Sequence, residues 1–262
     1  MRTVKTDYRG PGASESALGV QHNLFDAEPE LIMSALSTVL YPINRAGWPF
    51  IAAFAAATAL FFWLWAPLGW IGLILTLWCI YFFRDPHRTI PLRKGLMVSP
   101  ADGRVTMIVP AVPPPELDMG PEPMLRISIF LNVFNVHVNR VPIDGTVVKA
   151  AYHPGKFLSA SMDKASDVNE RAAVRLKLAD GKEIAFVQIA GLVARRIITT
   201  LKDGQDVRTG ERYGLIRFGS RLDIYLPRNA EPLVIVGQTA IGGETVLVDF
   251  DSAEPARTGL RD

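Results

Sequence analysis

The chain contains one long stretch without a charged residue, from Trp48 to Phe83. A helix that crosses the hydrocarbon core of a bilayer needs about 20 apolar residues, so this stretch is too long for one ordinary span. Near its middle, Pro67 removes a helix hydrogen-bond donor and Gly69 favours a turn. The pattern therefore predicts either a tight hairpin of two helices, which would span the bilayer or re-enter it, or one long kinked helix.

Basic residues flank this stretch on both sides. Arg45 precedes it, and Arg84, Arg88, Arg93 and Lys94 follow it. Because positively charged flanks tend to stay on the cytoplasmic side, they favour the hairpin, with both of its ends on that side. We therefore expect the cell (inner) membrane as the location, with the following domain facing the cytoplasm. A helix pair buried in a soluble core is disfavoured, since such helices usually carry a polar face.

The segment before the apolar stretch divides into two parts. Residues 1–27 are polar and lack the apolar core of a signal peptide, so they predict a disordered tail. The sequence EPELIMSALSTVLYPINRAG (28–47) has the pattern of a short amphipathic helix that ends at Pro42 and lies along the membrane surface. Residues 28–83 are thus expected to form this helix and the membrane hairpin.

After Arg84 the pattern changes to short alternating runs separated by glycine, proline and aspartate, which are typical of strands. LADGKE (178–183) predicts a β-hairpin turn, whereas the proline-rich stretch 112–123 cannot be a central strand. We predict a mainly β fold, a β-rich barrel or sandwich catalytic domain over residues 84–262, with an N-terminal hydrophobic helical hairpin. The expected strands are 104–109, 125–131, 134–140, 146–152, 172–178, 183–189, 213–218, 221–226, 233–236 and 245–250.

Composition excludes some classes of function. The formal net charge is only +2, and no basic run is interleaved with aromatic residues, so we expect no nucleic-acid partner. Cys79 is the only cysteine, which rules out a disulfide within the chain. The four histidines are scattered without the spacing of metal ligands, so we predict no metal site.

Three polar residues stand out on the β pattern. Asp102 lies in SPADGRV before a strand, His137 lies within the apolar strand NVHVNRVP, and Ser220 follows Gly219 in the turn FGSR. Such residues can form a catalytic triad, but a triad is defined by geometry, and each residue alone is more typical of a turn or of packing. On these residues the chain could be a membrane-anchored serine hydrolase, or a non-catalytic β-rich module tethered to the membrane.

Seven longer motifs occur along the chain in a fixed order. They are SPADGRV, FLNVFNVHVNRVP, YHPGKF, NERAAVRL, QIAGLVARRI, GERYGLIRFGSRLDIYLP and GETVLVDF. Together they resemble the phosphatidylserine decarboxylase family, particularly its short form, over about residues 43–250. The resemblance implies decarboxylation of phosphatidylserine, taken from the bilayer, to phosphatidylethanolamine and CO₂ in phospholipid biosynthesis.

The same resemblance implies a cofactor that is made from the chain. Loss of CO₂ from an amino acid requires an electron sink that unmodified side chains lack. In this family the sink is a pyruvoyl group, which here would form when Ser220 Oγ attacks the carbonyl of Gly219 and the chain breaks between these residues. The products would be a β subunit (1–219) and an α subunit (220–262). A homodimer of the processed enzyme is also compatible with the sequence. Gly219 suits this step because it has no side chain to block the attack.

The resemblance also assigns catalytic roles to His137 and to Asp102, which would orient the imidazole. The long form of the family has two histidines three positions apart, the second being the maturation base, and this chain has Arg140 at that position. Either His137 serves both self-cleavage and protonation of the substrate carbanion, or Asp102 or water takes the first task. Arginines are expected to bind the anionic lipid; the candidates are Arg140, Arg171, Arg195, Arg196, Arg217 and Arg221.

Overall fold

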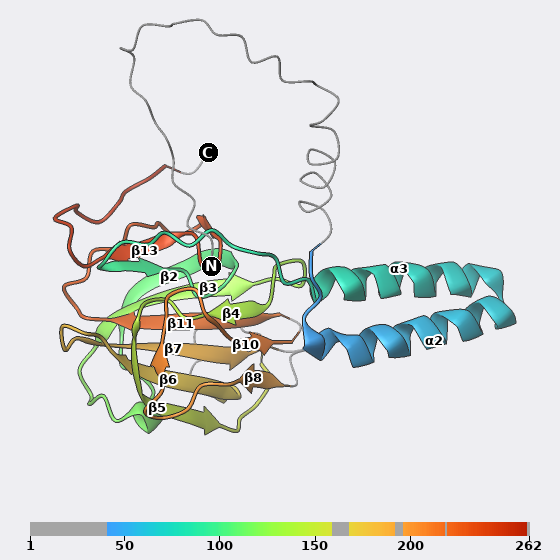
Figure 1. The fold of residues 1–262 in the computed structure, drawn as a ribbon, viewed down its shortest axis with the longest axis horizontal. Coiled ribbons are helices and arrows are strands. Elements are labelled where there is room, and N and C mark those ends of the chain that lie inside the picture. The colour runs from blue at the N-terminus through green and yellow to red at the C-terminus, as the bar shows by residue number, and fades with distance from the viewer. Residues whose placement is uncertain (1–40, 159–167, 192–195, 218, 261–262) are drawn as a thin grey trace, which may run out of the picture. The chain divides into compact units, whose positions relative to one another are not determined.

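The computed structural model describes residues 41–158, 168–191, 196–217 and 219–260, and Figure 1 draws its ribbon. The predicted disordered tail, residues 1–27, and residues 28–40 of the predicted amphipathic helix lie outside the described residues. The first described helical turn is the 3-10 turn η1 (Arg45–Gly47), and its Asn44 caps it by accepting a hydrogen bond from Ala46 N.

The apolar stretch forms a hairpin of two helices, not one kinked helix. Helix α2 (Trp48–Leu64) and helix α3 (Ala66–Phe82) are separated by Trp65 alone, whose backbone is extended. The break lies one residue before the predicted APLG turn. Pro67 belongs to the first turn of α3, where its missing N–H costs no helix hydrogen bond.

Small and polar residues bring the two helices together. Gly69 lies inside α3 and not in the turn, and a Cβ at this position would be 2.3 Å from the ring of Phe62. At Gly72 a Cβ would be 2.8 Å from Thr58 Oγ1, so α2 and α3 approach closely there. The hydroxyl groups of Thr58 and Thr76 share a hydrogen bond of 2.9 Å between the helices. Small residues with interhelical hydrogen bonds are the usual basis of helix pairing in membranes.

The outer surface of the hairpin is apolar. Trp63, near its tip, is 81% exposed, and Ile74 in α3 is 66% exposed. The segment Arg45–Leu64 is long and apolar enough to cross a membrane by length and composition, and α3 is a shorter apolar helix. An exposed apolar surface of this kind is typical of contact with lipid or protein, which supports association with a membrane.

The β domain is built around one antiparallel sheet of eight strands that curls into a half-barrel (Figure 1). Its strand order is β12-β2-β3-β11-β7-β6-β5-β9. The bounds are β2 (Gly103–Ala111), β3 (Met124–Leu131), β5 (Gly145–His153), β6 (Arg171–Lys177), β7 (Glu183–Ala190), β9 (Asp206–Val207), β11 (Ser220–Leu226) and β12 (Thr239–Ala240). The predicted hairpin at LADGKE joins β6 to β7, with Gly181 at a positive φ of 85°.

Two smaller sheets complete the domain. One has the order β4-β10-β8, formed by β4 (Val138–Arg140), β10 (Arg212–Ile216) and β8 (Ile197–Thr199); the other pairs β1 (Leu96–Val98) with β13 (Val246–Asp249). The mainly β fold class with its helical hairpin is therefore confirmed.

Two strand predictions were wrong. The expected strand 134–140 is reduced to β4, because residues 133–135 form a turn in which Asn132 and Asn135 side chains bind the backbone. Residues 233–236 form bends and a turn. The strands that the pattern missed, β1, β8, β9 and β12, have only two or three residues, too few for an alternation to be read.

Hydrophobic packing joins the hairpin to the β domain. The base of the hairpin, which we define by Phe50, Phe54, Trp78, Phe82 and Phe83, forms one cluster with Val136, Val138 and Leu215. The far side of the large sheet is covered by the proline-rich connection, where the 3-10 turn η2 (Pro115–Leu117) buries Leu117. In Figure 1, α2 and α3 therefore extend side by side from one end of the β domain.

We expect Gly72→Val to separate α2 from α3, because its Cβ would also be 3.2 Å from Thr58 Cα, which is backbone and cannot move aside. Overpacking of this kind lowers the free energy of unfolding by about 1–3 kcal/mol. Thermal unfolding in detergent micelles, followed by circular dichroism, measures the loss. Ile74→Val, on the outer surface of α3, is the matched control, and an equal effect of both variants would contradict this packing.

Candidate active site

The segment that contains Ser220 connects two different sheets. Strand β10, which ends at Ile216, belongs to the three-stranded sheet, and strand β11, which begins at Ser220, lies in the middle of the eight-stranded sheet between β3 and β7. The sequence predicted a turn at FGSR between two expected strands, 213–218 and 221–226, but these strands do not pair with each other. Because β10 ends at Ile216 and β11 begins at Ser220, the Gly219–Ser220 peptide bond lies where the chain enters the second sheet, a point that we call the crossing.

The backbone at the crossing requires glycine. Gly219 has a φ of +72°, in the left-handed region that side chains disfavour, and a Cβ there would meet only Val133 at 4.0 Å. Ser220 is fully buried as the first residue of β11. Its Oγ has no hydrogen-bond partner among the described residues. A buried hydroxyl without a hydrogen-bond partner is unusual in folded proteins, which makes Ser220 a candidate for a reactive residue.

His137 lies against the crossing. It is not inside a strand, as the sequence suggested, but directly before β4. Gly219 N donates a hydrogen bond to His137 Nε2 over 3.3 Å, and His137 Nδ1 lies 2.9 Å from the carbonyl oxygen of Asn135. These contacts require Nδ1 to carry the proton and leave Nε2 as the acceptor. The basic nitrogen of a neutral imidazole therefore faces the residue that precedes Ser220.

Burial keeps this imidazole neutral. His137 is fully buried, and its ring lies 4.3 Å from the ring of Phe82 at the base of the hairpin. Burial lowers the pKa of His137 to about 4, the hydrogen bond to Asn135 opposes this shift, and the positive charge of Arg84 adds to it. At neutral pH, Nε2 is accordingly available as a base.

Asp102 does not contact His137 within the described part of the chain. It lies in the connection between β1 and β2, where its Oδ2 accepts a hydrogen bond of 2.6 Å from Arg88 and its Oδ1 one of 2.8 Å from Gly242 N. Burial raises the pKa of Asp102, while Arg88 acts in the opposite direction. The structure thus brings Gly219, Ser220 and His137 together, and it places the Asn135 carbonyl where the sequence analysis expected a carboxylate. Every residue has a backbone carbonyl, so the sequence could not indicate that the carbonyl of Asn135 binds His137.

Comparison with known proteins gives the site its context. A family profile described as phosphatidylserine decarboxylase matches residues 75–248. The phosphatidylserine decarboxylase proenzyme of Paramagnetospirillum magneticum is 63% identical over 219 residues, which cover 84% of this chain and 91% of that protein. The proenzyme of the same name from Cereibacter sphaeroides is 60% identical over 229 residues, 87% of this chain and 99% of that protein.

The chain belongs to the phosphatidylserine decarboxylase family. It is therefore an enzyme of the carboxy-lyase class, and the matched range includes the positions of Asp102, His137, Gly219 and Ser220. Both relatives are named as proenzymes, a name for a precursor that is processed.

Three of the six candidate arginines are already engaged by other groups of the described residues. Arg140 donates to the carbonyl oxygens of Gly210 and Pro86, both at 3.0 Å. Arg171 binds both carboxylate oxygens of Glu116, and Arg221 forms a fully buried ion pair with Asp223. Arg195 lies outside the described residues. The remaining two candidates are Arg196 and Arg217.

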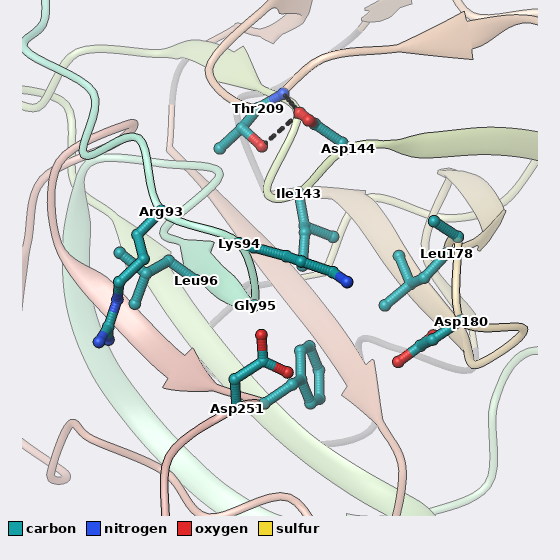
Figure 2. Close-up of a pocket in the computed structure, with 12 residues that line it drawn as sticks. Arg93, Lys94, Gly95, Leu96, Ile143, Asp144, Leu178, Asp180, Thr209 and Asp251 are labelled. Carbon is teal, nitrogen blue, oxygen red and sulfur yellow. Dashed lines mark hydrogen bonds between the residues drawn. The ribbon is translucent and has the colours of Figure 1, made fainter.

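A separate pocket, of about 170 Å³, lies at the other end of the sheet (Figure 2). It is lined by Lys94, Asp144, Leu178, Asp180 and Asp251, among others. Leu178 and Asp180 belong to the β6–β7 turn, whereas Ser220 pairs with Ala190 at the opposite end of β7. The pocket is therefore separated from Ser220 by the length of that strand. Among the described residues, no group of three or more His, Cys, Asp and Glu could hold a metal ion.

The buried imidazole predicts a specific dependence on pH. Nuclear magnetic resonance of the ¹⁵N-histidine-labelled Ser220→Ala chain should find His137 with a proton on Nδ1 at pH 7 and an apparent pKa of about 4. His137→Gln identifies its signals among those of the other three histidines.

The same shift is linked to stability. The unfolded chain binds a proton near pH 6.5 and the folded chain only near pH 4, so folding becomes less favourable as pH falls through this window and is unaffected above it. Across this window the free energy of unfolding falls by an amount on the order of 3 kcal/mol. Titration of His137 near its ordinary value of about 6.5 would contradict the burial described here.

Proposed function

We propose that this chain is the precursor of a pyruvoyl-dependent phosphatidylserine decarboxylase that cleaves itself between Gly219 and Ser220. The observation that carries the proposal is the geometry of the crossing. A buried serine hydroxyl without a described partner follows a glycine at positive φ, and a neutral imidazole accepts a hydrogen bond from that glycine. Membership of a family whose named members are proenzymes supports the same reading.

Self-cleavage would use only groups at this crossing and water. Ser220 Oγ attacks the carbonyl carbon of Gly219, the peptide C–N bond breaks, and an ester replaces the amide while the hydroxyl proton passes to the leaving amine. Loss of the Ser220 α-proton then expels the carboxylate of Gly219 and leaves dehydroalanine. Its enamine takes up one water and releases one ammonia, which gives the pyruvoyl group. The products are the β subunit, residues 1–219, and the α subunit, residues 220–262.

His137 is the proposed base for this process. A serine hydroxyl is a weak nucleophile and needs a neighbouring base. His137 Nε2 is unprotonated and lies 3.3 Å from Gly219 N, one residue from the bond that breaks. Arg140, which stands where the long form of the family has its second histidine, is engaged with Gly210 and Pro86. We therefore assign both the maturation base and the later proton donor to His137.

Asp102 is proposed to support this base through charge. Arg84 lowers the pKa of His137, and Asp102 acts favourably on the charge of Arg84. Loss of the Asp102 carboxylate would leave Arg84 and Arg88 less compensated and would make the imidazole a weaker base. In this proposal Asp102 would act on His137 through Arg84, and the Asn135 carbonyl would orient the ring.

The residues at the crossing fit a pyruvoyl group. Ser220 is its buried precursor, held between Leu131 of β3 and Ala190 of β7, and its Oγ has no hydrogen-bond partner within the described ranges. Once formed, the group supplies an electrophilic carbonyl that binds the substrate amine and takes up the electrons that CO₂ leaves behind. His137 is the proposed source of the proton that the substrate carbon then receives.

The hairpin is proposed to hold the enzyme at its lipid substrate. Its outer surface is apolar, its two ends carry arginines, and its base packs against His137 through Phe82. The site would therefore lie at the membrane boundary, with the β domain on the cytoplasmic side of the cell (inner) membrane. A serine hydrolase that acts on external substrates is not favoured, because Ser220 is fully buried in the continuous chain.

Ser220→Ala should abolish both chain cleavage and CO₂ release from phosphatidylserine in mixed micelles, because both require the hydroxyl. Denaturing gels follow cleavage, and release of labelled CO₂ from the carboxyl group of the serine headgroup follows activity. Ser252→Ala, at an exposed serine, is the control. CO₂ release by the Ser220→Ala protein would exclude a pyruvoyl group from this residue.

Separate replacements of His137 and Asp102 distinguish the proposed base from the residue that acts on it through charge. His137→Gln should slow cleavage of the newly made chain by about 100-fold or more, the usual range for loss of a general base. Asp102→Asn should slow it about tenfold or less, since it changes only the electrostatic environment of the base. Cell-free synthesis followed by timed gels measures both rates. If Asp102→Asn stopped cleavage while His137→Gln permitted it, the base would be Asp102.

A further inference from the structure

Two arginines lie directly opposite one another at the end of the three-stranded sheet. Strands β8 and β10 pair with Ile197 opposite Ile216, and the next residue pair continues the ladder, with Arg217 N bonded to Arg196 O over 3.5 Å. Like charges at opposed positions of an antiparallel pair repel each other and destabilise it. The opposed positions of Arg196 and Arg217 therefore lower the stability of the sheet, which points to a role for them other than folding.

The two arginines face the base of the hairpin. Leu215 and Ile198, which pair with each other, pack in the cluster at the hairpin base. Because side chains alternate along strands, Arg217 and Arg196, each two residues away, point to the same side. The guanidinium carbon of Arg217 indeed lies 4.8 Å from the centre of the Phe50 ring.

Neither arginine has an ion-pair partner among the described residues. Arg217 is half-buried, and its Nε is buried without a hydrogen-bond partner within the described ranges. Burial lowers the pKa of Arg217, and the charge of Arg196 lowers it further. Arg84, a nearby cation, already donates to the carbonyl oxygens of Tyr81 and Phe134. An anion between Arg196 and Arg217 would relieve both their repulsion and the unsatisfied donor.

The pair is close to the proposed catalytic residues. Arg217 is three residues before Ser220, and its neighbour Ile216 donates its N–H to the carbonyl oxygen of His137 at 3.4 Å. A row of ring contacts along the hairpin base also leads from one to the other: Arg217 lies over Phe50, Phe50 stacks on Phe83, Phe83 contacts Phe82, and Phe82 contacts His137.

We propose that Arg196 and Arg217 bind the phosphodiester of the lipid headgroup; this inference rests on the proposed function. Arginine presents paired donors that match phosphate oxygens. The serine carboxylate is the less suitable ligand, because a cation pair that held it would stabilise the group that must leave as CO₂ and would oppose the reaction. The phosphate keeps its charge throughout, so binding it positions the headgroup without this penalty.

Steady-state kinetics with phosphatidylserine in mixed micelles test the assignment. Arg217→Gln and Arg196→Gln should each raise KM about tenfold, as expected for loss of a charged hydrogen bond, with kcat changed less than threefold. Arg217→Lys, which keeps the charge but not the paired donors, should recover only part of the loss. Arg228→Gln, an exposed arginine beyond the other end of β11, is the matched control and should leave KM unchanged. Complete self-cleavage confirms the fold of each variant, and the exposed Arg196 decides the question if Arg217→Gln does not mature.

Inhibition by glycerophosphoethanolamine, which has the phosphodiester but no carboxylate, identifies the anion. Its inhibition constant should rise in the arginine variants by the same factor as KM. An unchanged inhibition constant beside a raised KM would assign the two arginines to the carboxylate and overturn the proposal. A KM equal to that of the wild type in both variants would also overturn it. Failure of the unmodified chain to cleave or to release CO₂ would instead refute the proposed function, before any arginine variant is compared.

Discussion

The site depends on one backbone constraint, the passage of the chain from a small sheet into the centre of a large one at Gly219–Ser220. Residue 220 must join two ladders at once, to β3 and to β7, while residue 216 is still held in the sheet of β4 and β8. Only three residues separate residue 216 from residue 220, and one of them, Gly219, adopts a positive φ. The hydrogen bond from Gly219 to His137 fixes the imidazole against the crossing. Rigid pairing on both sides thus holds one peptide bond beside one neutral base.

The second constraint is the attachment of the hairpin to this crossing. Asn44 N and Asp85 N donate to the carbonyl oxygens of Phe83 and Pro42, which clamps the two ends of the hairpin together. Asp85 then pairs with Arg140 and Arg212 of the β domain. Arg140 is therefore a structural link at the position where the long form of the family has its second histidine. The aromatic base of the hairpin contributes to the burial that lowers the pKa of His137, so the same packing attaches the hairpin and keeps the imidazole neutral.

Patterns in the sequence predicted those features that rest on local periodicity or local residue chemistry. The uncharged stretch and Pro67 indicated the hairpin, and alternation indicated most long strands, whereas Gly219 and Ser220 stood out only through the resemblance of the longer motifs. They did not predict that β10 and β11 belong to different sheets, because strand partners are set by tertiary packing. Nor could they place Asp102 on Arg88, or Asn135 on His137, since both contacts depend on loop conformation. The opposed arginines appeared as equal candidates until the register of β8 and β10 distinguished them.

Intact mass spectrometry of the purified enzyme under denaturing conditions tests the central claim most directly. Self-cleavage with pyruvoyl formation predicts two polypeptides, residues 1–219 and residues 220–262, with the smaller one lighter by one ammonia than its serine-initiated sequence and resistant to N-terminal sequencing. A catalytically active preparation that contains only the continuous chain, or a small fragment that begins with an unmodified serine, would contradict it.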